Sequence, residues 1–190
     1  MWIDSGASFE GYMKISDNSF STEILNYLPP INTYVDPPSK KNLVNLLEND
    51  FRIEKVSAES NFIDVKYLGN SFNSKKLNLL LKISENIQRL DLSNIDLSSV
   101  NISKLKELKN IKYLNLSKTN LSGKNLEILP ENLELLIINS NPIQAPQLIK
   151  IANNPFINKI FAYNTINNEE LEKSLTSETN NKLFFGMSLK

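Results

Sequence analysis

The 190-residue sequence contains neither cysteine nor histidine. Disulfides, thiolate nucleophiles, Cys/His zinc sites and histidine general bases are therefore excluded. Only five glycines occur, and neither a glycine-rich phosphate loop nor an aspartate-rich loop of the EF-hand type is present. We accordingly expect no catalytic residues, no metal and no cofactor in this chain. The lack of cysteine does not decide the compartment, because it suits both a reducing cytosol and an oxidising periplasm.

An excess of charge of either sign is also lacking, since 21 basic residues balance 21 acidic ones. Only Arg52 and Arg89 are arginines, and lysine is the poorer residue for bidentate recognition of phosphate. Nucleic acid is therefore not an expected partner. Met1–Gly6 has neither the basic start nor the apolar centre of a signal peptide. The longest apolar run, around Leu135–Ile138, is too short to cross a bilayer, so we expect no membrane contact by this chain.

A short apolar phrase recurs five times between residues 62 and 162. Ile87-Gln88-Arg89-Leu90-Asp91-Leu92 and Ile111-Lys112-Tyr113-Leu114-Asn115-Leu116 both have apolar residues at positions 1, 4 and 6. The same positions are filled in the other three units by Phe62/Val65/Tyr67, Leu133/Leu136/Ile138 and Ile157/Ile160/Ala162. Positions 4 and 6 lie on one face of an extended chain, so each phrase predicts a short strand. Such recurrence indicates a repeat architecture, in which one unit cannot bury its apolar face without its neighbours.

Each strand is followed by a turn and by a second apolar pair at helical spacing. These pairs are Leu77/Leu80, Ile102/Leu105, Leu126/Leu129 and Leu148/Ile151. Position 9 of the unit, where the chain leaves the strand, carries Asn70, Thr119, Asn141 and Thr165, whereas Ile95 departs from this pattern. We expect the amide or hydroxyl at position 9 to bond backbone groups that the turn leaves unpaired.

From Phe62 to about Leu175 the pattern resembles the leucine-rich repeat family, in its longer, helix-containing form. The resemblance implies an α/β solenoid with parallel strands on a concave face and helices on a convex face. We predict a mainly helical cap and linker over 1–50, the repeats over 51–176, and a tail over 177–190.

The segments before and after the repeats also allow predictions of secondary structure. Helices are predicted over Ser21–Leu28 and Ser39–Leu47, and a strand over Phe51–Val56. In the last unit one residue is lost from the turn, and Asn167–Glu170 is expected to form a capping box. The segment Leu183–Phe185 is expected to cover the open end of the repeats, with a disordered apolar tail as the alternative.

The opening phrase Trp2-Ile3-Asp4-Ser5-Gly6-Ala7-Ser8-Phe9 resembles the last helix of the planctomycete-type cytochrome c domain. This resemblance implies that the chain is the C-terminal repeat region of a bacterial membrane protein and lies on the periplasmic side. The haem-attachment C-x-x-C-H is absent here, so a c-type haem would belong to an upstream domain. Without that context, the cytoplasm is the expected compartment.

Outward-facing strand positions line up across the repeats, about 4.8 Å apart. We predict a protein-binding concave face made by Arg89, Tyr113, Asn115, Leu135, Ile137, Phe161 and Tyr163. Aromatic residues and arginine are enriched at the centres of protein interfaces. The alternative is that the C-terminal tail folds back over Leu135 and Ile137.

The expected function is therefore non-catalytic protein interaction or scaffolding by a monomeric chain. One alternative is a structural spacer that positions a haem domain. A small hydrolase is a second alternative, for which the neighbouring carboxylates Asp64 and Asp91 are the candidates. Since Lys66 and Arg89 lie alongside them, we expect a charge-paired surface at this place instead.

Overall fold

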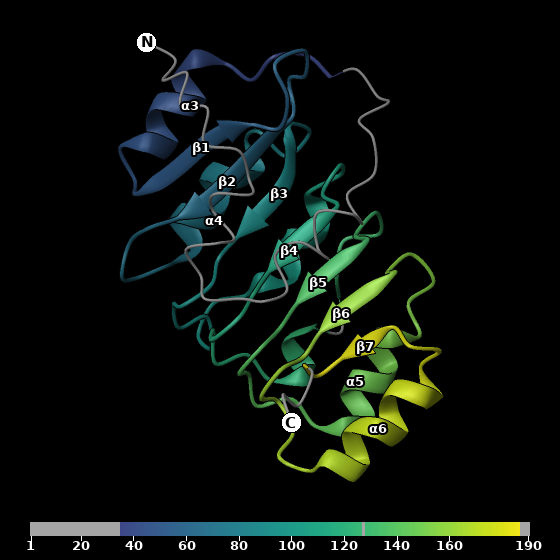
Figure 1. Ribbon diagram of the computed structural model, residues 1–190. Helices are drawn as coiled ribbons and strands as arrows, with labels where there is room; N and C mark the ends of the chain where they lie inside the picture. Colours follow the sequence, from purple (N-terminus) through teal and green to yellow (C-terminus); the bar gives the residue numbers. More distant parts are fainter. Residues whose placement is uncertain (1–34, 127, 187–190) are drawn as a thin grey trace. The chain divides into compact units, whose positions relative to one another are not determined.

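The chain divides into two units, Met1–Thr33 and Tyr34–Lys190, and all residues described below belong to the second. The computed structural model describes residues 35–126 and 128–186 (Figure 1). The cytochrome-like phrase Trp2–Phe9 and the expected helix Ser21–Leu28 lie outside the described residues. None of the described helices is long and apolar enough to cross a membrane.

Seven strands form one sheet in which spatial order follows chain order (Figure 1). The strands are β1 (Phe51–Lys55), β2 (Ile63–Tyr67), β3 (Ile87–Asp91), β4 (Tyr113–Asn115), β5 (Leu135–Ile137), β6 (Lys159–Phe161) and β7 (Leu183–Phe184). β1 pairs with β2 in antiparallel orientation, and every later pair is parallel. The expected α/β class is confirmed at this level, as a mixed fold with a mostly parallel sheet.

The register of the sheet follows the repeat positions. The position-4 residues pair from strand to strand as Val65↔Leu90, Leu90↔Leu114, Leu114↔Leu136 and Leu136↔Ile160. All of these side chains belong to one continuous buried cluster. The alignment of units read from the sequence therefore holds for all five strands.

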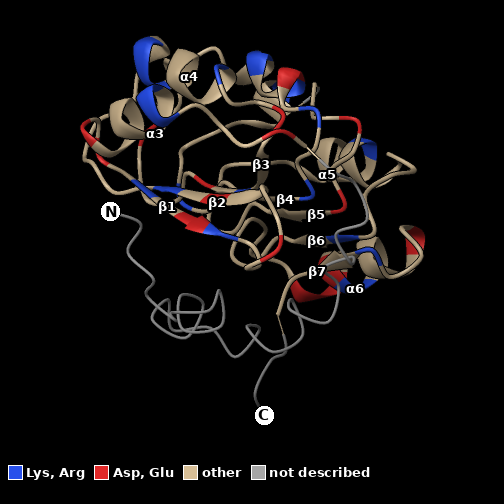
Figure 2. Cartoon of the chain, turned by 90° about the horizontal axis from the view of Figure 1, so that it is seen from above, with Lys and Arg blue, Asp and Glu red and all other residues tan. Residues whose placement is uncertain are grey.

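One helix precedes β1, and helical segments connect the strands from β2 onward. They are α3 (Lys40–Leu47), α4 (Ser74–Leu81), the 3-10 helices η1 (Ile102–Glu107) and η2 (Gly123–Leu126), α5 (Ala145–Ala152) and α6 (Glu169–Glu178). In Figure 2, α3, α4 and α5 lie on one face of the sheet. The apolar pairs at helical spacing therefore form α-helices in some units and tighter 3-10 turns in others.

The main core lies between the sheet and these helical segments. Its helical contribution comes from the predicted pairs. Leu129 is only partly buried against the cluster, and the other seven members are buried in it: Leu77, Leu80, Ile102, Leu105, Leu126, Leu148 and Ile151. Full burial of one such aliphatic side chain stabilises a fold by roughly 1.5–3 kcal/mol. Because the cluster runs from α3 to β7 without a break, each unit depends on its neighbours for burial.

The helix starts are set by polar side chains. Ser39 caps α3 by accepting a hydrogen bond from the Asn42 amide at 3.3 Å, as the predicted helix from Ser39 requires. The predicted capping box Asn167–Glu170 is wrong by one residue. The N-cap of α6 is Asn168, whose side-chain oxygen accepts from the Leu171 amide at 3.0 Å.

After β3, β4, β5 and β6, the turn places position 8 of the unit in the left-handed region. Asn94, Lys118, Ser140 and Asn164 have φ values of 63°, 54°, 55° and 55°. Asparagine tolerates this conformation better than other residues with a Cβ, so Asn94 and Asn164 suit it, whereas Lys118 and Ser140 do not. The turn geometry is thus repeated even where the residue type is unfavourable.

At the C-terminal end, β7 adds a strand parallel to β6. Leu183 is fully buried in the main cluster, and Phe185 joins it at 7% exposure. α6 packs against both α5 and β7. The last unit is therefore followed by a further layer of backbone and apolar side chains.

Candidate protein-interaction face

The sheet face opposite α3, α4 and α5, called the outward face below, carries two rows of side chains. The first row is Asp64, Arg89, Tyr113, Leu135 and Lys159, paired in that order. The second row is Lys66, Asp91, Asn115, Ile137, Phe161 and Phe184. The structure therefore brings six of the seven predicted site residues into two adjacent rows, with Tyr163 just beyond the end of β6.

The part of this face on β1–β3, the charged half, is made of ion pairs. Arg89 Nη1 lies 3.2 Å from Asp64 Oδ2, and Lys66 Nζ lies 3.3 Å from Asp91 Oδ2. Figure 2 shows both signs of charge on β1 and β2. The expected charge pairing of Asp64 and Asp91 is therefore confirmed.

Asp64 is the most perturbed carboxyl group on the outward face. Its side chain is 15% exposed, and its Oδ1 atom has no hydrogen-bond partner. Burial raises the pKa of Asp64 from 3.8 to about 6, and the negative charges of Glu54 and Asp91 add to this increase. The Arg89 guanidinium lowers the pKa, but it does not offset the loss of solvation.

The part of the face on β4–β7, the apolar half, is buried where we expected it to be exposed. Tyr113, Leu135, Ile137 and Phe161 are only 1%, 1%, 4% and 2% exposed, although none of them belongs to the main core cluster. One reason is mutual packing between adjacent strands, since the rings of Phe161 and Phe184 lie 5.6 Å apart. The exposure expected for these four residues is therefore wrong.

Lys159 places a cation within the apolar half. It is 3% exposed, and its Nζ lies 4.0 Å from the ring centre of Phe184 and 5.4 Å from that of Phe161. An ammonium over an aromatic face is attracted by the ring quadrupole. The aliphatic stem of this lysine meanwhile continues the apolar row beyond Leu135.

The two remaining predicted site residues, Asn115 and Tyr163, differ in whether their side chains are available to a partner. Asn115 uses its side-chain oxygen locally, accepting from Ser117 N at 3.0 Å and Ser117 Oγ at 2.8 Å. Tyr163 is 56% exposed and lies two residues after Phe161. Tyr163 is thus the accessible aromatic residue at the border of the apolar half.

Polar side chains at position 9 bond backbone groups in the third to fifth units, as predicted. Asn141 Oδ1 accepts from the amides of Thr119 and Leu121, both at 3.1 Å, and its Nδ2 donates to the Leu116 carbonyl at 2.6 Å. Asn141 thereby links the fourth unit to the third. Thr119 and Thr165 donate their hydroxyls to carbonyls three residues earlier, at 2.7 Å and 2.6 Å.

A second row of asparagines was missed in the sequence. Asn61, Asn86, Asn110 and Asn132 each precede position 1 of a unit and donate to carbonyls of Val35, Asn61, Glu85 and Lys109 respectively. The signal was present, since the same residue type recurs at the same position in four units. In the fifth unit Phe156 replaces asparagine and is 56% exposed.

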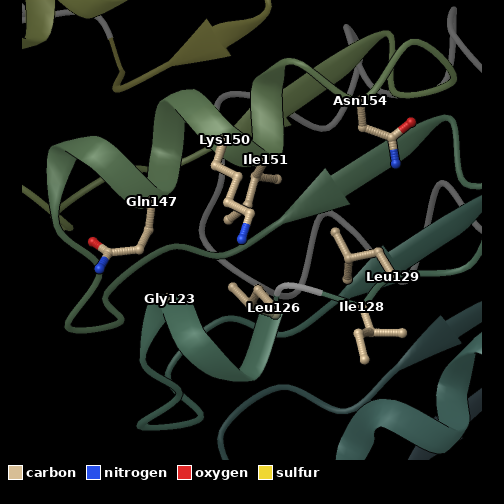
Figure 3. A pocket seen from close by; sticks show the side chains of 8 residues that line it. All are labelled: Gly123, Leu126, Ile128, Leu129, Gln147, Lys150, Ile151 and Asn154. Atoms are coloured by element: carbon tan, nitrogen blue, oxygen red, sulfur yellow. The ribbon is translucent and has the colours of Figure 1, made fainter.

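A pocket of 220 Å³ lies between η2 and α5, away from the outward face (Figure 3). Leu126, Ile151 and Lys150 point toward one another in it, and Gln147 extends beside Gly123. A Cβ added at Gly123 would lie 2.2 Å from Gln147 Cγ, so glycine permits this approach. Lys150 is the only titratable residue among the eight that line the pocket, which therefore lacks an acid–base pair.

Within residues 35–126 and 128–186, no three acidic side chains gather as a metal site would need.

The chain matches no protein-family model and no curated protein sequence. Among solved structures, it is similar to the tropomodulin C-terminal domain of Caenorhabditis elegans, with a TM-score of 0.42 and 14% sequence identity. The match covers 59% of this chain and 81% of that domain. A likeness at this level assigns neither a family nor a function.

Proposed function

We propose that this chain is a leucine-rich repeat solenoid that binds a protein partner without catalysis, at the exposed border of the apolar half of its outward face. The observation that carries the proposal is Tyr163, 56% exposed at the border of an apolar layer outside the main core that is made of Tyr113, Leu135, Ile137, Phe161 and Phe184. The solenoid assignment is supported by the in-register pairing of five units.

A repeat unit needs only its inward apolar positions to fold onto its neighbours. Burial of positions 4 and 6 against the helical segments already joins each strand to its neighbours. The outward positions have no part in that core, and in the charged half they are polar. Aliphatic and aromatic residues at the same positions of β4–β7 form a second apolar layer, and the exposed Tyr163 at its border is the kind of residue that protein interfaces enrich.

Tyr163 is the residue through which a partner would first meet this surface. It is 56% exposed and borders Phe161, whose ring packs on Phe184. Tyrosine supplies a large rigid contact area at low entropic cost, and it is enriched among residues that dominate binding energy. The proposed partner is a protein that carries its own apolar segment, and the chain acts as a monomer without a cofactor.

The test compares two exposed residues at the same position of their units. Tyr163→Asp changes the border of the apolar half, and Leu68→Asp changes a residue that is 58% exposed at the end of β2. Both purified variants are used as bait in extracts of the source cells, and the retained proteins are quantified by mass spectrometry. Tyr163→Asp should lose specific partners at least tenfold, while Leu68→Asp should retain them. Equal recovery with both variants would refute the proposed site.

A structural spacer is the alternative, and one observation favours it. The buried state of Tyr113, Leu135, Ile137 and Phe161 means that this layer contributes to the stability of the chain itself. A spacer would retain no partner with either bait. The two functions are therefore distinguished by the wild-type bait alone.

The larger context is a separate proposal. The phrase Trp2–Phe9 supports a place behind a cytochrome c domain on the periplasmic face of a bacterial membrane. The reading frame upstream of Met1 tests it, since a C-x-x-C-H motif and membrane spans are expected there. A frame that contains neither would contradict this context without affecting the binding proposal.

A further inference from the structure

Asp64 occupies an unusual place in the charged half. It pairs directly with Glu54 across the antiparallel β1–β2 ladder, which sets two carboxyl groups side by side. Like charges directly opposite each other on a sheet are destabilising. The β1–β2 pairing therefore brings two carboxyl groups together, and protonation of either one removes the repulsion between them.

The hydrogen bonding around the two acids is unequal. Glu54 accepts a hydrogen bond from Arg52 on the same strand, and Asp64 Oδ2 accepts one from Arg89 at 3.2 Å. Asp64 Oδ1, by contrast, is buried without a partner. A buried carboxylate oxygen without a donor carries a desolvation cost, which a proton on that carboxyl group removes.

A β-bulge fixes this geometry. The β2–β3 register shifts between Ile63 and Asp64, so that Asp64 pairs with Arg89 while Ile63 pairs with Ile87. A β-bulge changes the direction in which the side chains beside it point, and it is a specific feature of a sheet and not a defect. Here the bulge brings Arg89, and not Gln88, beside the carboxyl group.

Charged and titratable groups surround Asp64 on every strand nearby. They are Arg52 and Glu54 on β1, Lys66 on β2, Arg89 and Asp91 on β3, and Tyr113 on β4. The Tyr113 hydroxyl stays protonated, because burial raises its pKa well above the usual range. When Asp64 is ionised, this set contains three cations and three anions. Its net charge is therefore zero, and Arg89 does not create a positive environment for Asp64.

We propose that Asp64 takes up a proton as the chain folds in mildly acidic solution, so that β1–β3 are held more tightly there than at neutral pH. This device is independent of the proposed binding function. Its sign follows from the shift in the carboxyl pKa, which is 3.8 ordinarily and about 6 in the fold. Between these values the folded chain holds a proton that the unfolded chain has released, so stability falls as the pH rises through this window.

The direct experiment is a carboxyl ¹³C NMR titration of the full chain, with the Asp64 signal assigned through its bonds to the backbone. We expect a midpoint near 6. Glu54→Gln removes a neighbouring negative charge and should lower this midpoint. A wild-type midpoint at or below 4, the ordinary range for aspartate, would overturn the proposal.

A second experiment measures urea unfolding from pH 3 to pH 7.5. The unfolding equilibrium constant of the wild type should rise about 100-fold more over this range than that of Asp64→Asn, because two pKa units correspond to a factor of 100. Equal pH dependence of the two chains would refute the proposal. If Asp64→Asn does not fold, the wild-type and Glu54→Gln titrations still decide it.

Discussion

The charged half and the apolar half of the outward face belong to the same sheet but carry different kinds of side chain. On β2 and β3, the outward positions form the ion pairs Asp64–Arg89 and Lys66–Asp91. On β4–β6, the same positions carry Tyr113, Leu135, Ile137 and Phe161, all at most 4% exposed. The inward positions 4 and 6 are alike in both halves, since all belong to the main cluster. The repeat therefore fixes the fold, while its outward positions are free to differ from unit to unit.

The two halves should also differ in their contributions to stability. Partly exposed ion pairs contribute about 0–1 kcal/mol each, because solvent screens them and side-chain entropy opposes them. A buried aliphatic residue contributes several times as much, because its removal loses transfer energy and leaves a cavity. Substitutions at matched positions can measure this difference.

The largest effect is expected for Ile137→Ala in the apolar half. Ile137 is 4% exposed, so truncation should lower the free energy of unfolding by about 4 kcal/mol in urea denaturation. Leu68→Ala is the control, because Leu68 is 58% exposed and its truncation should cost less than about 0.5 kcal/mol. A cost below about 1 kcal/mol for Ile137→Ala would show that the apolar half is not packed.

Asn141→Ala should cost somewhat less, about 3 kcal/mol, because the amides of Thr119 and Leu121 lose their acceptor inside the fold. The control is Asn132→Ala, whose exposed amide makes a hydrogen bond to the Lys109 carbonyl at 2.6 Å. Its loss should cost about 1 kcal/mol. Equal costs for the two variants would contradict the buried linkage between the third and fourth units.

Lys66→Ala in the charged half should cost about 1 kcal/mol or less, since its ion pair with Asp91 is 26% exposed on the lysine side. Repeating the denaturation in about 1 M NaCl should reduce the cost further, because salt screens exposed pairs. A salt-independent cost above about 2 kcal/mol would mean that the charged half is as tightly packed as the apolar half.

The smallest effect is a gain. Lys118 is exposed and has a φ of 54°, where asparagine is tolerated better, so Lys118→Asn should stabilise the chain by about 0.5 kcal/mol. The equivalent residue in the charged half is already asparagine, Asn94. Thermal unfolding would show an increase in Tm of a few degrees at most. A decrease in Tm would contradict the shared turn geometry.

The sequence predicted those features that one unit repeats from the next. Strand positions, register and the hydrogen-bonding role of Asn141 and Thr119 all follow from spacing, because side-chain direction in a strand has a fixed period. The row that begins at Asn61 and Asn86 was open to the same reasoning but was overlooked.

Other features depend on contacts between segments that spacing does not specify. The burial of Ile137 and Phe161 depends on what packs on the outward face. Periodicity predicts that these side chains lie on that face, but it does not predict what covers them. The raised pKa of Asp64 results first from its burial, and the charge of Glu54, its partner across the β1–β2 register, adds to it, while Arg89 beside the bulge opposes it. The choice between α-helices and 3-10 turns likewise depends on the local path between two packed strands.

The most direct test of the shared register uses the absence of cysteine from the chain. Lys66 and Asp91 are directly paired on β2 and β3, so their replacement by two cysteines should give a disulfide under mild oxidation. The pair Lys66→Cys/Asn115→Cys, two strands apart, is the control. We predict rapid intramolecular crosslinking of the first pair and none of the second. Equal crosslinking of both pairs, or none of the first, would contradict the side-by-side arrangement of the repeat units.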